Sequence, residues 1–112
     1  ILNSRTIFSE RENGKMTLRR GFEIIKGENV LVCEDVVTTG GSVFEILDII
    51  KEKNANISGV GFIIDRSNGK VNFGCDQFSL ASIEVLKFPP DKIPDWLEKI
   101  PVSKPGSRSL KT

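Results

Sequence analysis

The groups that could do chemistry in this chain are concentrated between residues 30 and 42, in the segment VLVCEDVVTTGGS. The donors that a phosphate requires are supplied there by Thr38, Thr39, Gly40, Gly41 and Ser42. Glycine lets backbone amides approach closely, hydroxyl groups donate hydrogen bonds, and a following helix offers its positive N-terminal end. The spacing excludes a G-x-G-x-x-G dinucleotide fingerprint and a triphosphate-binding loop that ends in Gly-Lys-Ser/Thr. The run therefore predicts a site for a single phosphate monoester, although it also fits a capped helix after a glycine turn.

Two adjacent acids, Glu34 and Asp35, precede this glycine-rich run. Carboxylates beside a phosphate are electrostatically unfavourable unless the hydroxyl groups of a sugar or a divalent cation occupy the gap. For the pair in isolation, a solvated glutamate and a loop-capping aspartate are the simpler interpretation. The acids and the phosphate-binding run together predict a narrower ligand, a pentose 5-phosphate held at both ends.

These groups must be positioned by the elements on either side of them. Residues 30–33 form a continuous apolar run, typical of a parallel strand buried on both faces, so Cys33 is expected in the core. From Ser42 the apolar residues recur at helical spacing, with Ser42 as the expected cap and Glu45 as its capping-box partner. The helix is expected to end at residues 54–56, and residues 57–64 predict a second buried strand.

Strand, loop, helix and strand make a βαβ unit, in which the two strands are parallel and the crossover is right-handed. Ligands bind outside the carboxyl ends of the strands of such a sheet. Residues 34–42 follow one predicted strand, and Asp65 and Arg66 follow the other. The sequence therefore predicts that both polar clusters lie at one edge of the sheet and form one site.

The segments on either side of this unit predict shorter elements. Short strands are expected at residues 5–9, 15–18 and 21–25. The Asn13-Gly14 pair favours a hairpin with positive φ angles, within a basic hairpin at residues 10–22. Towards the C-terminus, the expected elements are a strand at residues 78–88, one helical turn at 95–99 and an extended tail at 101–112. We expect a single domain over residues 1–112.

The composition excludes several classes of function. The chain has 112 residues and a formal net charge of +1, so no overall field favours nucleic acid or acidic lipid. It contains no histidine and two cysteines, Cys33 and Cys75, which excludes a histidine-dependent triad within the chain and leaves too few ligands for structural zinc. Neither a membrane-spanning apolar run nor a signal peptide is recognisable, so a reducing, cytoplasmic setting is expected.

The segment at residues 30–42 resembles the phosphoribosyl diphosphate signature of the type I phosphoribosyltransferases: a hydrophobic strand, two acids, two apolar residues and T-T-G-G-S. The segments that resemble the orotate phosphoribosyltransferases, the pyrimidine-pathway branch of that family, are GKMTLRRGF at 14–22, IIDRSNG at 63–69 and KPGSR at 104–108. The resemblance covers nearly the whole chain and matches about the second half of such an enzyme. The family's amino-terminal hood segment and its glycine-containing diphosphate-binding loop would precede Ile1.

The resemblance implies a fold and a set of contacts with phosphoribosyl diphosphate. The fold would be α/β, the Rossmann-like parallel-sheet core of the type I phosphoribosyltransferases with a short β-hairpin and without the N-terminal part. The acids would bond the ribose hydroxyls, and residues 38–42 would wrap the 5-phosphate. The residues implied to bind this substrate are Glu34, Asp35, Val36, Val37, Thr38, Thr39, Gly40, Gly41 and Ser42.

The resemblance also implies contacts with orotate. Thr38 and Arg66 fall where the orotate enzymes contact the pyrimidine and its carboxylate. A planar guanidinium at the end of a strand suits an anionic heterocycle. Without the resemblance, an ion pair with Asp65 or a surface position would be the simpler interpretation of Arg66.

Basic residues near the predicted hairpin turn are candidates for the diphosphate side of the reaction. Arg11 and Lys15 flank Asn13-Gly14, where similar enzymes carry a mobile basic loop that closes over the diphosphate. Bases there would neutralise the charge that develops on the departing group, which makes Arg11 and Lys15 the candidate catalytic residues. The pair at 19–20 could serve instead, or could face solvent.

The implied activity is that of a pentosyltransferase, a glycosyltransferase of pyrimidine (UMP) biosynthesis. A ring nitrogen of orotate displaces diphosphate from C1 of phosphoribosyl diphosphate and gives orotidine 5-phosphate. An oxocarbenium-like transition state leaves the enzyme chiefly the tasks of positioning and charge stabilisation. Mg2+ would travel with the diphosphate and take few direct protein ligands, and the resemblance implies a homodimer.

Three alternatives remain open at this point. A type I phosphoribosyltransferase that acts on a purine base shares the signature, although the three further segments argue against it. A non-catalytic regulator would keep the phosphoribosyl diphosphate site as a sensor. If the polypeptide begins at Ile1, we expect an inactive piece of the enzyme that binds its ligand with poor turnover.

Overall fold

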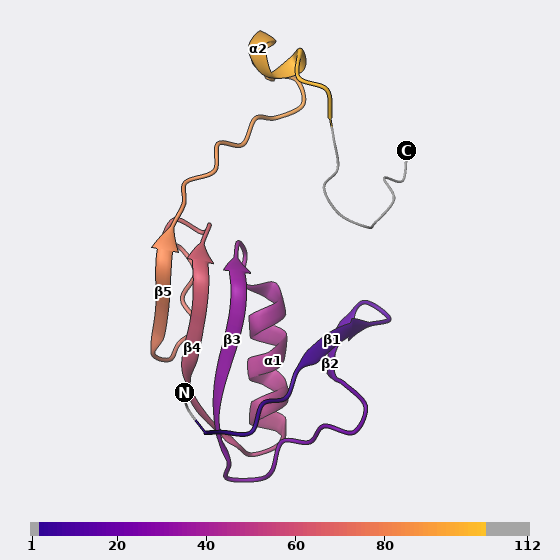
Figure 1. The fold of residues 1–112 in the computed structure, drawn as a ribbon, viewed down its shortest axis with the longest axis vertical. Coiled ribbons are helices and arrows are strands. Elements are labelled where there is room, and N and C mark those ends of the chain that lie inside the picture. The colour runs from indigo at the N-terminus through magenta and orange to yellow at the C-terminus, as the bar shows by residue number, and fades with distance from the viewer. Residues whose placement is uncertain (1–2, 103–112) are drawn as a thin grey trace.

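A parallel sheet of three strands forms the body of the molecule, and a long helix lies against it (Figure 1). The structure is a computed structural model and describes residues 3–102. The strands are β3 (Asn29–Val37), β4 (Asn56–Asp65) and β5 (Gln77–Ser82), in the spatial order β3-β4-β5. Helix α1 (Gly41–Glu52) connects β3 to β4, so the predicted βαβ unit with parallel strands is confirmed.

The register of the sheet aligns the carboxyl ends of its strands. Val37 of β3 pairs with Asp65 of β4, which in turn pairs with Ser82 of β5. Just beyond this rung, the Arg66 N–H donates to the Val37 carbonyl oxygen over 2.8 Å. The loop after β3 and the turn after β4 therefore begin side by side, at the edge where the sequence predicted a site.

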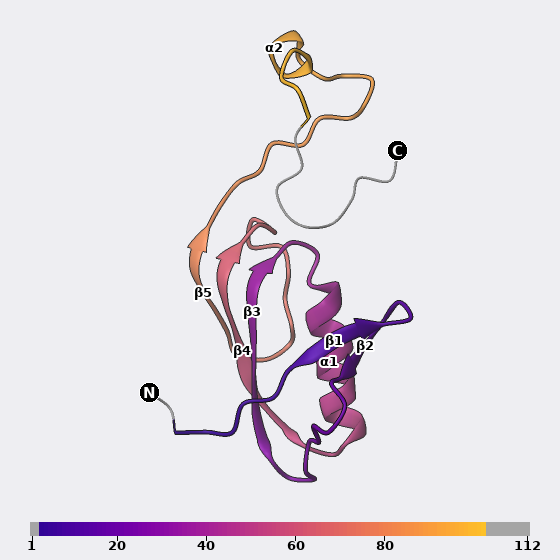
Figure 2. The same ribbon diagram turned by 45° about the vertical axis from the view of Figure 1, so that its right-hand side comes forward.

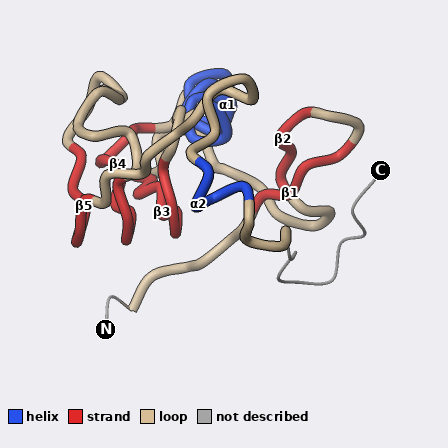
Figure 3. Tube along the Cα trace, turned by 90° about the horizontal axis from the view of Figure 1, so that it is seen from above, coloured by secondary structure: helices blue, strands red, loops and turns tan. Residues whose placement is uncertain are grey.

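Helix α1 covers one face of the sheet, and the other face is open to solvent (Figure 3). The helix buries Val43, Leu47 and Ile50 because these residues recur at helical spacing along one side of it. The rest of the core consists of Ile24, Val32, Val37, Val60, Phe62 and Phe73. The large apolar residues on the open face are Leu31, Ile63, Phe78 and Leu80, which are between 50% and 71% exposed.

The prediction that residues 30–33 are buried on both faces is wrong. Val32 is 8% exposed, but its neighbour Leu31 is 50% exposed, and Cys33 is exposed rather than in the core. Successive side chains of a strand point to opposite faces, and α1 covers only one of them. For the same reason Ile63 of β4 is 53% exposed, although residues 57–64 were expected to form a buried strand.

Strands β1 (Ser9–Glu12) and β2 (Lys15–Leu18) form an antiparallel hairpin that lies beside α1 (Figure 2). Its turn has φ angles of 50° at Asn13 and 84° at Gly14, as the Asn-Gly pair predicted. The prediction of a strand at residues 5–9 is wrong except at its last residue, because β1 begins at Ser9. The strand expected at residues 21–25 is also wrong, because Gly21 has a φ of 91° and the Phe22 N–H bonds back to the Arg19 carbonyl oxygen over 3.0 Å.

The C-terminal part leaves the sheet earlier than the sequence predicted. Strand β5 ends at Ser82 rather than at residue 88, because its partner in the described sheet, β4, ends at Asp65. The short helix α2 (Asp95–Glu98) confirms the predicted helical turn and lies away from the sheet (Figure 1). Of the tail expected at residues 101–112, only 101 and 102 are among the described residues, and the KPGSR segment lies outside them. Neither of the two described helices is long and apolar enough to cross a membrane.

Candidate functional site

The loop from β3 to α1 presents backbone N–H groups at a free helix N-terminus. Gly40 precedes the helix with a left-handed φ of 76°, and no side chain caps the helix. The first N–H groups of an α-helix lack partners within the helix and carry the positive end of its dipole. The first turn contains no acidic residue that would repel an anion. The geometry of residues 38–42 therefore suits a phosphate.

The predicted capping box at this helix end is wrong. The helix begins before Ser42, which lies inside its first turn and makes no cap hydrogen bond. Glu45 is also directed elsewhere, because its carboxylate accepts hydrogen bonds from Arg11 and from the Met16 N–H of the hairpin. The result is a helix end whose N–H groups are left for a ligand.

A pocket of about 220 Å³ opens over this helix end. The hairpin, the end of β3, the loop and the first turn of α1 contribute to its walls. The residues that line it are Arg11, Glu34, Val36, Val37, Thr38, Thr39, Gly40, Gly41, Ser42 and Val43. The structure thus brings together one acid, one base and the whole of the predicted phosphate-binding run.

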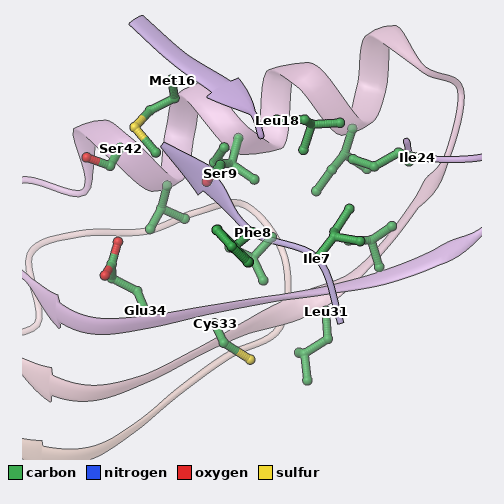
Figure 4. Close-up of a pocket in the computed structure, with 15 residues that line it drawn as sticks. Ile7, Phe8, Ser9, Met16, Leu18, Ile24, Leu31, Cys33, Glu34 and Ser42 are labelled. Carbon is green, nitrogen blue, oxygen red and sulfur yellow. The ribbon is translucent and has the colours of Figure 1, made fainter. Parts of the chain in front are cut away.

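The two adjacent acids of the predicted pentose site lie on opposite faces of β3. Glu34 is half-buried and lies on the same side as Ser42, whereas Cys33 beside it points away (Figure 4). Asp35 is exposed and lines a hollow on the open face of the sheet. Because β3 continues to Val37, the alternation of a strand separates the two carboxylates. Of the pair, only Glu34 lines the pocket at the helix end.

The environment separates the acidities of the two carboxyl groups. Partial burial raises the pKa of Glu34, and the Asp35 carboxylate raises it too, although the Asp35 N–H donates to Glu34 Oε1 over 3.0 Å and opposes the shift. The interaction with Glu34 lowers the pKa of Asp35, as does the Val36 N–H, which donates to Asp35 Oδ1 over 2.7 Å. A first proton taken up by the pair therefore resides on Glu34.

Asp65 shapes the turn that carries Arg66. Asp65 is only 8% exposed. Its carboxylate accepts hydrogen bonds from the N–H groups of Ser67, over 2.7 Å, and Gly69, over 3.1 Å. The Ser67 side chain and these N–H groups lower the pKa of Asp65, although burial opposes them. The carboxylate is thus directed at the turn backbone rather than at the Arg66 guanidinium. Arg66 is exposed beside the end of β3 and does not line the pocket over the helix end.

The candidate bases of the hairpin differ in position. The Arg11 Nη2 atom lies 2.8 Å from Glu45 Oε1 and 3.4 Å from Ser42 Oγ, so Arg11 reaches the phosphate-binding loop. Lys15 is exposed on the other side of the turn. Arg19 lies over the ring of Phe8, with 5.0 Å between its Cζ atom and the ring centroid, and its neighbour at position 20 is exposed. Neither arginine of that pair lines the pocket.

Two residues have roles at the site that the sequence did not predict. Glu45 fixes the hairpin to the helix. Its position three residues after Ser42 predicts that the two side chains lie on one side of the helix, but it does not predict that Glu45 binds Arg11 and Met16. Phe73 lies against Gly40 and supports the loop from below, together with Val71. Phe73 follows β4 by eight residues, and no pattern in the sequence connects it to the loop.

The described residues contain no group of three or more His, Cys, Asp or Glu side chains placed to hold a metal ion. The two acids of the predicted ligand site differ in position: Glu34 lines the pocket at the helix end, whereas Asp35 lines only the hollow on the open face of the sheet.

The sequence matches the model of the phosphoribosyl transferase domain family over residues 4–84. It is 53% identical over 111 residues to the orotate phosphoribosyltransferase of Chlorobium phaeobacteroides strain BS1, a match that covers 99% of this chain and 58% of that protein. It is also 53% identical over 110 residues to the orotate phosphoribosyltransferase of Thermotoga maritima, with 98% of this chain and 59% of that protein covered. The chain therefore spans less than two thirds of the length of the curated relatives that it matches.

Proposed function

Because this chain belongs to the phosphoribosyl transferase domain family, we propose that it binds phosphoribosyl diphosphate and takes part in the transfer of the 5-phosphoribosyl group to orotate. The names of its relatives favour orotate over a purine base as the acceptor. The product would be orotidine 5-phosphate, and the second product would be diphosphate. The protein would thus act as a pentosyltransferase in pyrimidine biosynthesis.

The observation that carries this proposal is the pocket at the N-terminus of α1. Residues 38–42 supply N–H groups and hydroxyls there, at a helix end with no side-chain cap and no acid in its first turn. These groups would hold the 5-phosphate of the substrate. Val36 and Val37 line the pocket beside them and would contribute backbone and apolar contact.

Glu34 would accept hydrogen bonds from the ribose hydroxyls, because it is the acid that shares the pocket with the phosphate-binding loop. Asp35 was expected to share this role. Because Asp35 lies on the open face, a ribose bound in the pocket could contact it only around the end of β3. We therefore assign the larger part of ribose recognition to Glu34. Asp35 would contribute as an ionised acceptor, because Glu34 and the Val36 N–H lower its pKa.

Orotate would bind between the loop after β3 and the turn after β4. Thr38 lines the pocket at the start of the loop, and Arg66 begins the neighbouring turn, where its N–H bonds to Val37. The Arg66 guanidinium would pair with the orotate carboxylate as a planar, bidentate donor. Its exposure leaves it free to do so, since Asp65 is occupied by the turn backbone.

The reaction would proceed by displacement at C1 of the ribose. The bond between C1 and the diphosphate oxygen breaks as a ring nitrogen of orotate forms the new bond. The electron pair of the broken bond leaves with the diphosphate, and the N–H proton of that nitrogen passes to the diphosphate or to water. Positive charge develops on the ribose ring and negative charge on the leaving group, so stabilisation of both charges lowers the barrier. Lys15 of the hairpin would stabilise the leaving diphosphate. Arg11 was expected to share this task, but its Nη2 atom lies 3.4 Å from Ser42 Oγ, so it would contact the 5-phosphate, and Glu34 would face the ribose.

Mg2+ bound to the diphosphate would neutralise part of the negative charge of that group. The chain offers no cluster of three acids, cysteines or histidines among its described residues, which fits a metal carried largely by the substrate. Glu34 and Asp35 are the side chains that would approach it. We also propose that the protein is cytoplasmic and forms a homodimer. Light scattering on the purified chain tests the dimer.

The decisive experiment measures binding and turnover in the same preparation. Calorimetry with phosphoribosyl diphosphate and Mg2+ should give a heat of binding that saturates. When orotate is then added, the ultraviolet absorbance of orotate should fall if this chain is sufficient for transfer. Binding without turnover would assign the ligand site and leave transfer to the longer protein. Absence of binding would refute the assignment of the pocket.

A matched pair of variants shows whether binding occurs in this pocket. Thr39→Val removes a hydroxyl that lines it, whereas Thr6→Val removes a hydroxyl from an exposed residue outside it. We expect the first change to weaken binding by roughly tenfold, the scale of one hydrogen bond to a charged group, and the second to leave it unchanged. Equal effects of the two changes would place the ligand elsewhere.

A further inference from the structure

Glu45 of helix α1 contacts both strands of the hairpin. Its Oε1 atom accepts a hydrogen bond from Arg11 Nη2 over 2.8 Å, and its Oε2 atom accepts one from the Met16 N–H over 2.7 Å. Arg11 and Met16 are directly opposite each other in the register of the hairpin. One carboxylate therefore fixes β1 and β2 to the helix at a single rung of their ladder.

This contact holds the Arg11 guanidinium at the rim of the pocket. Arg11 Nη2 lies 3.4 Å from Ser42 Oγ, and Nη1 donates to the Gly14 carbonyl oxygen. A guanidinium carries five N–H donors in a planar fork, so these contacts leave donors that can reach an anion. Arg11 is the only basic residue among those that line the pocket with the phosphate-binding loop.

The contact is too exposed to serve mainly as a source of stability. The Arg11 and Glu45 side chains are 44% and 38% exposed, and ion pairs of this kind contribute little to the free energy of unfolding. An acid so close to an anion site would also repel its ligand unless the charge were neutralised. The hairpin supplies that neutralisation through the Met16 N–H and Arg11, which lower the pKa of Glu45, with a smaller contribution from Lys15.

We propose that Glu45 is a positioning residue, which fixes the hairpin on α1 so that the Arg11 guanidinium points at an anion bound by residues 38–42. The proposal rests on the proposed function, because the anion is taken to be the 5-phosphate of the substrate. Glu45 does not touch the ligand, since both its oxygens are occupied by the hairpin. It acts through Arg11.

The first test is a double-mutant cycle on ligand affinity, with ribose 5-phosphate as the probe. Glu45→Gln keeps the shape of the side chain, and we expect it to weaken binding about tenfold, the scale of one charge-assisted hydrogen bond. The same change in an Arg11→Ala background should have almost no further effect. Asp48→Asn is the matched control, because it removes a solvent-exposed acid from the same helix.

The second test reports the hairpin contact without any ligand. In the wild-type protein the Met16 amide resonance should shift as Glu45 titrates, at a pH below the ordinary glutamate pKa of about 4.3. The shift should disappear in Glu45→Gln and persist in Asp48→Asn. If the substitution disrupted the fold in general, amide resonances throughout the protein would shift. Loss of the Glu45 contact alone should shift only those of the hairpin and of the start of α1.

The outcomes separate this proposal from the proposed function. Equal affinities of wild type and Glu45→Gln for ribose 5-phosphate, or equal losses with and without Arg11, would overturn the positioning role and leave the function intact. Ribose 5-phosphate binding that weakens in Glu45→Gln, with no binding of phosphoribosyl diphosphate by the wild type, would support the positioning role and refute the function. Failure of the wild type to bind either ligand would overturn both.

Discussion

The phosphate-binding loop rests directly on an aromatic ring: Gly40 lies so close to Phe73 that a Cβ atom at Gly40 would stand 2.8 Å from Cε1 of the ring. The same atom would stand 2.9 Å from Val71 Cγ1. Phe73 is 6% exposed, packs against Phe44 with 5.0 Å between ring centroids, and donates its N–H to Gln77 Oε1 over 2.9 Å. The loop therefore packs on a well-fixed aromatic ring. Glycine is required at position 40 because the backbone is left-handed there and because Phe73 and Val71 leave no room for a Cβ atom.

Gly40→Ala should destabilise the protein by about 2–4 kcal/mol, as the sum of left-handed strain and steric overlap with the ring. Urea unfolding followed by circular dichroism measures the change. Gly27→Ala is the matched control, because Gly27 has a φ of 78° with nothing within 4 Å of the added carbon. It should lose only the strain, roughly 1–2 kcal/mol.

The overlap with Phe73 can be isolated from the strain at Gly40. In a Phe73→Leu background, Gly40→Ala should cost less than in the wild type, with a coupling energy of about 1 kcal/mol. Additive effects of the two substitutions would show that the ring is not what excludes a side chain at position 40.

Asp65→Asn should destabilise the protein at neutral pH by about 1–3 kcal/mol, because one part-buried N–H of the turn loses its acceptor. The pKa of Asp65 is lowered in the folded state, so its contribution is fully present above the ordinary aspartate value of about 3.9. That contribution is lost as the pH falls through the lowered value. The difference in unfolding free energy between wild type and variant should therefore narrow on acidification, and a difference independent of pH would contradict this role.

Glu34→Gln should weaken ligand binding and at the same time stabilise the free protein at neutral pH. The pKa of Glu34 is raised, so ionisation opposes folding once the pH exceeds the ordinary glutamate value of about 4.3. A neutral amide removes this opposition and keeps the acceptor for the Asp35 N–H, so the variant should unfold at higher urea than the wild type at pH 7. The two proteins should converge in acid, and calorimetry with ribose 5-phosphate measures the loss of binding, about tenfold or more.

Phe78→Ser combined with Leu80→Thr should change stability little, because the two residues are 68% and 71% exposed on the open face of the sheet. Binding of a dye that fluoresces on apolar surfaces should fall in this variant. Ile50→Ala, at a residue with 0% exposure, should instead cost about 2–5 kcal/mol. Similar losses for both variants would show that the open face is covered in solution.

The local features of the site could be predicted from the sequence. Asn13-Gly14 predicts the hairpin turn, and the helical spacing of Val43, Leu47 and Ile50 predicts α1 and its buried side. The glycine-rich run between a strand and a helix likewise predicts the place of the pocket. These features depend on backbone conformation and on the period of side chains along one element, which neighbouring residues determine.

The remaining features were decided by the tertiary structure. The ladder to β4 extends β3 through Glu34 and Asp35, and it thereby places the two acids on opposite faces. Glu45 meets Arg11, which is 34 residues away in the chain, and Gly40 meets Phe73, because the crossover of the βαβ unit and the return of the chain after β4 bring them together. Such contacts depend on how distant elements pack, and no spacing within the sequence encodes them.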